Sequence, residues 1–176
     1  MWKVFGSIWK RSAPLKVIVF SWKALQDRIP SKFNLAGRNV WPADTSVLCE
    51  WCGSSVETAV HILLHCELAK EVWSKVIRWW NISLIIPPNL FIHWACWSGV
   101  ETRKKIKKGL GLVWHTSIWI LWKVRNNRIF NEGVESIDNL VDEIKVWSWR
   151  WAMYRFHMLP CMFFEWPWNP RDCILR

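Results

Sequence analysis

The sequence predicts a mainly α-helical protein, with a small helical domain organised around a Cys/His knuckle and further long helices after it. Apolar residues recur at helical spacing in several separate stretches. No stretch alternates apolar and polar residues strongly enough to predict a sheet. Three cysteines and one histidine follow one another with the spacing C-x2-C-x8-H-x4-C, at Cys49, Cys52, His61 and Cys66.

The first elements are predicted from prolines and a cap. Pro14 suits the start of a helix, and Pro30 ends it. Ser31 is a favourable cap for a short second helix through about Arg38, and residues 39–48 predict a loop. The first helix has its apolar positions at helical spacing, at Leu15, Ile18, Val19, Trp22 and Leu25.

The Cys/His pattern predicts one structural zinc ion. Three thiols and an imidazole suit tetrahedral Zn²⁺, and four protein ligands leave no position open for a reacting water. Gly53-Ser54-Ser55 predicts a turn after the first cysteine pair, and a short hairpin is compatible with it. His61 and Cys66 would point about 140° apart on an ideal helix, so either the helix starts late or its first turn is distorted. His65 remains an alternative ligand on this reasoning.

Four more helical stretches follow. The first opens at Glu57 or Thr58 and runs to Trp80, and it is expected to be the longest. A shorter helix is expected over 90–97 and a long one from the basic run to about Phe130. A final helix is expected from Ser136 or Asp138 to about Phe156. The domains are expected at 1–86 and 87–176, with an irregular tail from about residue 160.

Charge and aromatic content favour a polyanionic partner. The chain carries 24 Lys and Arg against 14 Asp and Glu, and residues 1–40 and 101–131 each carry eight basic side chains and one acid. Such blocks can bind phosphates, although a charge run is also typical of a solvated helix turn. About three quarters of the 18 Trp are expected to pack in the core, as aromatic stripes at helical spacing usually do. The candidate nucleic-acid contacts are Arg103, Lys104, Lys105, Lys107, Lys108 and Trp51, the last with a hydrophobic lid as its alternative role.

The remaining features argue against secretion and membrane insertion. The N-terminus lacks the pattern of a secretory signal, and the apolar window 110–124 is shorter than the ~20 residues that span a bilayer. We therefore expect an intracellular, reducing compartment, with the nucleus as one candidate. Cys96, Cys161 and Cys173 are expected to be buried or inert thiols.

The residues around the knuckle resemble the zinc-binding domain found in reverse transcriptases of plant LINE-type (non-LTR) retrotransposons. The resemblance covers about residues 5–80, and in that family the histidine position corresponds to His61 rather than His65. A later segment, 119–130, resembles the W-x-I-W-x-x-R-N-x-x-x-F sequence that often follows this domain in plant proteins. The matching blocks are Pro14–Val17, Phe20–Trp22, Ile29–Ser31, Glu57-Thr58, His61–Cys66, Ala69 and Val72-Trp73.

Two functions are compatible with these features. The first is a retroelement-derived zinc-binding module that binds RNA or single-stranded DNA through its basic and aromatic residues. The alternative is a zinc-stabilised helical scaffold that docks on a polymerase or another protein. No polymerase or ribonuclease H motif is visible, so we expect no enzymatic activity.

Overall fold

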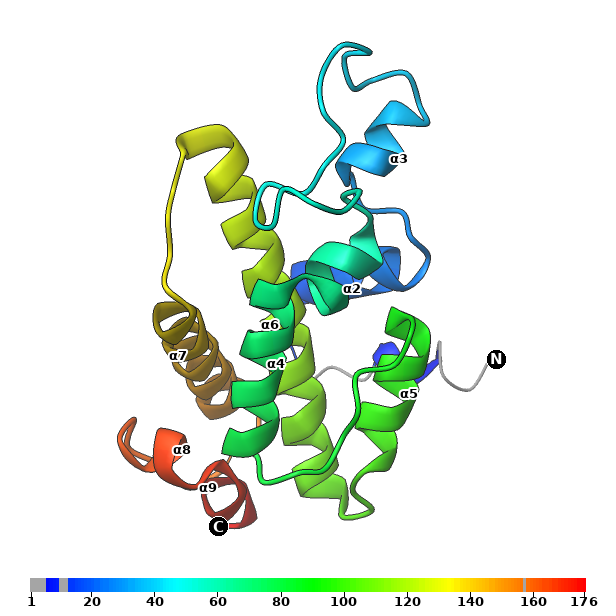
Figure 1. Ribbon diagram of the computed structural model, residues 1–176. Coiled ribbons are helices and arrows are strands. Elements are labelled where there is room, and N and C mark those ends of the chain that lie inside the picture. The colour runs from blue at the N-terminus through cyan, green and yellow to red at the C-terminus, as the bar shows by residue number, and fades with distance from the viewer. Residues whose placement is uncertain (1–5, 10–12, 157) are drawn as a thin grey trace.

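The computed structural model describes residues 6–9, 13–156 and 158–176, and it confirms a mainly α-helical fold (Figure 1). No strand occurs within these residues, and one isolated antiparallel bridge joins Leu48 to Val56. The elements in chain order are α2 (Leu15–Leu25), α3 (Lys32–Ala36), the π-helix η1 (His61–His65), α4 (Glu67–Trp79), α5 (Leu90–Gly99), α6 (Lys104–Asn131), α7 (Ile137–Arg155), α8 (Glu165–Trp168) and α9 (Pro170–Leu175).

Helix α6 is the central element of the fold. It contacts α2, η1, α5, α7 and α9, and Figure 1 shows these elements on several sides of it. Its middle section, from Gly109 to Ile118, is buried on every side. With 28 residues α6 is the longest described helix, so the prediction that the helix after the knuckle would be longest was wrong. A helix that is apolar all round is typical of a core position and shows little of the one-sided pattern that marks a surface helix.

The predicted helix starts depend on side-chain caps. Ser31 Oγ accepts a hydrogen bond from the backbone N–H of Asn34, at 3.3 Å. Ser136 does the same for Asn139 at 3.2 Å, so Ser136 rather than Asp138 is the cap of α7. Each bond satisfies one of the backbone donors that a helix leaves unpaired at its start.

Tryptophan packing supplies much of the core. Trp73, Trp97 and Trp114 are fully buried around the ring of His93. Their indole N–H groups are satisfied, for example by a 2.7 Å bond from Trp97 to the carbonyl of Leu110. Burying one such side chain contributes about 4 to 6 kcal/mol as an upper estimate. Among the described tryptophans only Trp9 and Trp168 are exposed, which agrees with a packing role for most of them.

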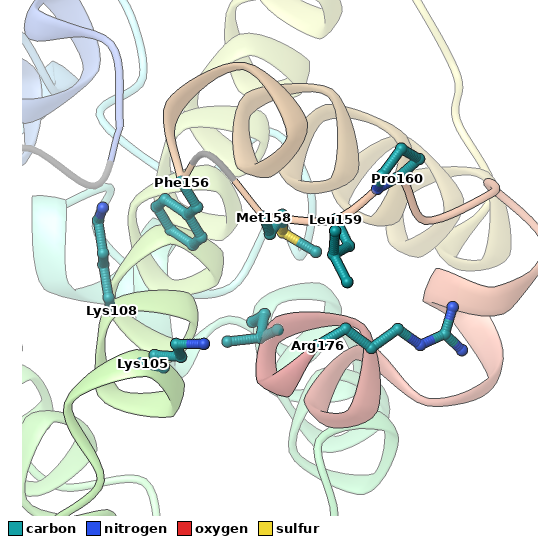
Figure 2. A pocket seen from close by; sticks show the side chains of 8 residues that line it. Lys105, Lys108, Phe156, Met158, Leu159, Pro160 and Arg176 are labelled. Carbon is teal, nitrogen blue, oxygen red and sulfur yellow. The ribbon is translucent and has the colours of Figure 1, made fainter.

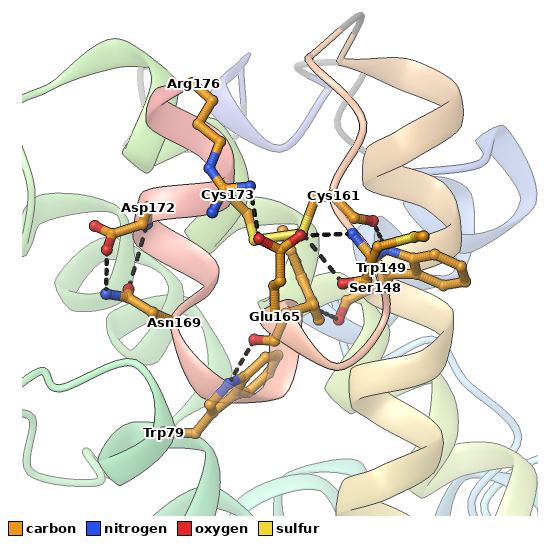
Figure 3. Close-up of a disulfide and its surroundings, with 11 residues drawn as sticks. Trp79, Ser148, Trp149, Cys161, Glu165, Asn169, Asp172, Cys173 and Arg176 are labelled. Carbon is orange, nitrogen blue, oxygen red and sulfur yellow. Dashed lines mark hydrogen bonds and ion pairs between the residues drawn. A yellow bond between two sulfur atoms is a disulfide. The ribbon is translucent and has the colours of Figure 1, made fainter.

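The segment after residue 160 differs from the irregular tail that the sequence predicts. It forms α8 and α9, and Asn169 caps α9 ahead of Pro170. Cys161 and Cys173 lie 5.8 Å apart between their Cα atoms and form a disulfide (Figure 3). The expectation of free thiols was therefore wrong for this pair, whereas Cys96 is a free thiol and is exposed. Sequence spacing alone could not show that the turn between α8 and α9 folds the two cysteines together.

Both predicted domains contribute to one hydrophobic core. Residues of α2, η1 and α4 pack with residues of α5, α6 and α7 in a single buried cluster. The boundary near residue 86 stays a prediction. Among the described helices, none combines the length and apolar character that a bilayer crossing requires.

We predict that two buried histidines make the fold sensitive to acid. Burial lowers the pKa of His93 and of His115 to about 3, whereas an unfolded histidine titrates near pH ~6.5. Between these values the unfolded chain binds protons that the folded chain does not. The contribution of these two histidines is therefore constant above pH ~6.5, and it falls below that pH by up to about 1.4 kcal/mol per pH unit for each histidine.

Urea denaturation between pH ~7 and ~5 measures this effect. His93→Gln removes one titrating group and leaves the metal-ligand candidates intact, so its stability should fall less steeply with acid than that of the wild type. Equal slopes for the two proteins would contradict the prediction.

Candidate metal centre

The structure brings the four predicted ligands together. The Sγ atoms of Cys49, Cys52 and Cys66 and one ring nitrogen of His61 all lie within 4.8 Å of one another. Cys49 Sγ is 3.9 Å from Cys66 Sγ, and Cys52 Sγ is 3.3 Å from His61 Nε2. A tetrahedral site with Zn–S bonds of ~2.3 Å places its sulfurs about 3.8 Å apart. The donors thus have both the chemistry and the spacing for one Zn²⁺.

A tight hairpin positions the first two cysteines. The backbone N–H of Cys49 donates to Ser55 O at 2.9 Å, and that of Gly53 donates to Cys49 O at 2.8 Å. Gly53 has φ of 63°, in the left-handed region that glycine adopts without a steric penalty. The short hairpin that is compatible with the sequence is therefore present, closed by the single β-bridge between Leu48 and Val56. It places the Cys49 and Cys52 thiols next to His61 and Cys66.

A π-helical turn positions His61 and Cys66. The N–H of Cys66 donates to His61 O, five residues earlier, at 2.7 Å. This wider turn brings residues five apart closer to the same side than an α-helix does. Cys66 itself is extended, with ψ of 144°, and α4 begins only at Glu67. The prediction of one continuous helix from Glu57 or Thr58 was therefore wrong. The distorted turn that the spacing of His61 and Cys66 requires is present as η1.

His65 lies outside the cluster. Its Nε2 is 3.1 Å from the carbonyl oxygen of Pro87, so its ring contacts the segment that leads into α5. The geometry therefore favours His61 as the imidazole of the site.

The thiols interact strongly with one another. The hydrogen bond with Cys66 lowers the pKa of Cys49 to about 6, and the same contact raises the pKa of Cys66. Hydrogen bonds from Ser54 lower the pKa of Cys52 to about 7. Cys49 and Cys52 therefore favour the thiolate form that a metal requires, while Cys66 gives up its proton when the ion binds.

A buried ion pair fixes the hairpin and η1 to the core, and the sequence did not reveal it. The Glu57 carboxylate, which is fully buried, pairs with the Arg125 guanidinium from α6. Glu57 Oε1 also accepts from Arg125 Nε at 3.1 Å and from the backbone N–H of Lys32 at 2.9 Å. Both residues stood in segments that resembled the plant family, but 68 positions separate them, so nothing in the pattern paired them.

Two further contacts hold the hairpin. Arg128 Nε donates to the backbone carbonyl of Glu50 at 3.0 Å. The buried Lys32 donates to Leu48 O at 2.9 Å and pairs with the Glu50 carboxylate. Lys32 belongs to the first basic block, and this internal role removes it from the residues available to a polyanion.

The candidate nucleic-acid contacts fall into two separate places. Arg103, Lys104, Lys105 and Lys108 are exposed at the start of α6, and Lys107 is half-buried there. Trp51 lies on the hairpin, half-buried against the core, next to the Glu50 carbonyl that Arg128 holds near the other end of α6. Lys105 and Arg128 lie 23 positions apart on α6, which is about 35 Å at 1.5 Å per residue. The structure therefore does not join Trp51 to the basic run in one site.

Comparisons with known proteins agree with this centre. Residues 2–73 match a protein family described as zinc-binding in reverse transcriptase, and this range contains all four converging side chains. The resemblance to the reverse transcriptase zinc-binding domain is thus confirmed for this segment. An Arabidopsis thaliana protein named "Putative ribonuclease H protein" is 25% identical over 157 residues, which are 87% of this chain and 24% of that protein. The chain spans about a quarter of the length of this relative. No solved structure matches the chain.

We predict that zinc binding depends on the four clustered ligands and not on a cysteine elsewhere in the chain. Cys49→Ser removes a ligand and should lower bound zinc from one ion per chain to a small fraction of that value, because three donors bind the ion far more weakly. Cys96→Ser is the matched control, since Cys96 is a free, exposed thiol outside the cluster. Metal analysis of the purified proteins measures the difference. Zinc retained by Cys49→Ser at the level of Cys96→Ser would refute the site.

We also predict strong coupling between Glu57 and Arg125. Removing one partner strands a buried charge and should cost about 3 to 5 kcal/mol of unfolding free energy. Replacing both in Glu57→Leu/Arg125→Met should cost less than the sum of the single changes. The exposed pair Glu67–Lys70 serves as a control, where a similar cycle should give below about 1 kcal/mol. Additive losses at Glu57 and Arg125 would contradict the coupling.

Proposed function

We propose that this chain is a zinc-stabilised module that binds RNA or single-stranded DNA through the lysines at the start of α6 and performs no polymerase or nuclease chemistry. The observation that carries this proposal is a group of unpaired cations at one helix start. Lys104, Lys105, Lys107 and Lys108 form no ion pair within the described residues. Unpaired lysines can release the counterions that surround phosphates, which favours binding to polyanions.

Acidic neighbours cancel little of this charge. Glu101 pairs with Arg103 and also with Arg171 of α9, so one carboxylate is shared between two guanidinium groups. The hydrogen bonds from Arg103 lower the pKa of Glu101 to about 2, which keeps this carboxylate ionised. The N-cap residue Arg103 makes no side-chain cap hydrogen bond, and Glu101 Oε1 accepts from the backbone N–H groups of Thr102 and Arg103 just before the first turn. The positive charge available to phosphates therefore comes from the lysines.

The zinc centre has a structural role in this proposal. Four protein ligands give a closed site, which holds a fold and offers no open position for catalysis. Within the described chain, this is the one cluster of three or more side chains able to ligate a metal. The Arabidopsis relative carries the name of an enzyme that acts on nucleic acid, and this chain corresponds to about a quarter of it. These points support a nucleic-acid context and a binding role for this portion.

A protein-interaction role is the second candidate. Phe164, just before α8, is 74% exposed, and Trp168, at the end of α8, is 89% exposed. Aromatic residues are enriched where proteins bind one another. Most other tryptophans pack inside, as a scaffold requires. A polymerase or another protein partner fits this surface, and we propose no membrane association.

We predict that the basic run sets the salt dependence of binding. Lys104→Ala/Lys105→Ala should weaken binding to a single-stranded oligonucleotide and reduce the slope of log K against log salt by about 1.4, since each phosphate contact on a single strand contributes about 0.7. Lys23→Ala/Lys70→Ala changes the net charge equally on α2 and α4 and should leave the slope unchanged. Fluorescence anisotropy at several salt concentrations measures both. Equal slopes for the two double variants would overturn this site, and no binding by the wild type at low salt would overturn the function.

A further inference from the structure

A cavity of about 440 Å³ lies beside the basic run, between the start of α6 and the segment that follows α7 (Figure 2). This volume is in the range of pockets that hold small ligands. Its wall combines cationic with apolar side chains, and six of them matter here: Lys105, Lys108, Arg176, Phe156, Met158 and Leu159.

The cationic side of the cavity is available to an anion. Lys105 and Lys108 project from α6, and neither forms an ion pair within the described residues (Figure 2). Lys108 Nζ lies 4.3 Å from the centre of the Phe156 ring, so a cation–π contact holds it at the rim. Arg176 pairs with Glu165 at 2.7 Å, which leaves the two lysines as the uncompensated charges.

The opposite side of the cavity is apolar and partly open. Phe156 and Met158 are half-buried, and Leu159 is 60% exposed. An aromatic ring beside two lysines matches the two halves of a nucleotide, because lysine binds the phosphate and the ring stacks on the base. A duplex holds its bases paired inside the helix, so it could reach the lysines without filling the apolar side.

The packing of α9 keeps the cavity in shape. Ile174 of α9 sits against Gly109 of α6, where any β-carbon would clash with it. The Cys161–Cys173 disulfide ties α9 to the segment that leads out of the cavity. The two walls therefore come from elements that are fixed to one another, as a preformed pocket requires.

We propose that this cavity takes one unpaired nucleotide, with its phosphate on Lys105 and Lys108 and its base against Phe156, and so selects single strands over duplexes. This inference rests on the proposed function and specifies how the same basic run distinguishes its ligands. The source of the nucleotide is an RNA or DNA strand with unpaired bases.

The test compares a single-stranded oligouridylate with a duplex RNA of equal length, by anisotropy at fixed salt. Phe156→Leu keeps apolar volume and removes the ring, and it should weaken single-strand binding about 5- to 150-fold, the effect expected for one lost base stack. It should weaken duplex binding far less, because there the ring only supports Lys108. Trp168→Ala is the control, because Trp168 is exposed yet does not line the cavity. Circular dichroism checks that both variants fold. A photocrosslink from 5-iodouridine should map to Phe156, Met158 or Leu159.

The outcomes separate the two proposals. If the wild type binds single strands and Phe156→Leu binds them equally well, the cavity proposal is wrong and the basic run remains as a phosphate site. The same holds if Phe156→Leu weakens single-strand and duplex binding by the same factor. If the crosslink maps elsewhere on a protein that binds normally, the cavity proposal is also wrong. If the wild type binds neither ligand at low salt, the proposed function itself is wrong, and this inference falls with it.

Discussion

The buried pair of Glu57 and Arg125 is the interaction on which the arrangement of this molecule depends. The zinc ligands organise only residues 49–66, and a metal ion cannot by itself decide where that segment sits. Glu57 lies between the second cysteine and His61, and its carboxylate is held by a guanidinium from the central helix and by the backbone of Lys32. The pair therefore connects the metal segment, the start of α3 and α6 at one point inside the protein.

A buried ion pair is weak evidence for stability, because desolvating two charges offsets much of their attraction. Its physical effect here is specificity of position. A displacement of the hairpin that separated the two groups inside the core would leave buried charges without partners, at a cost of several kcal/mol. Arg125 also lies against the Trp122 ring, 4.9 Å from its centre, so its side chain is held in one orientation before it reaches Glu57. The zinc centre and the helical body are thus joined by a contact that tolerates little movement.

Local signals explain what the sequence could predict. Pro14, Ser31 and Ser136 act within a few residues of themselves, and the helix starts predicted at these residues agree with the structure. The convergence of Cys49, Cys52, His61 and Cys66 was also predictable, since zinc-ligand spacing is a local pattern. The break at Cys66 was only half predictable: the spacing required a distortion, but a π turn followed by an extended residue depends on how η1 packs on α6. The Glu57–Arg125 pair and the Cys161–Cys173 bridge depend on tertiary packing, and residue spacing carries no information about them.

The length of α6 has a consequence for how metal and ligand binding are related. Arg125 and Arg128 hold the zinc hairpin near one end of this helix, and the basic run lies at the other end, about 35 Å away. Screening at physiological salt has a length of about 8 Å, so the charge of the metal centre does not act directly on phosphates at the basic run. Under the proposed function, an influence of zinc on nucleic-acid binding has to pass through the packing of α6, whose middle is buried on all sides. In the proposed function the metal would therefore act only by maintaining the helix that presents the lysines.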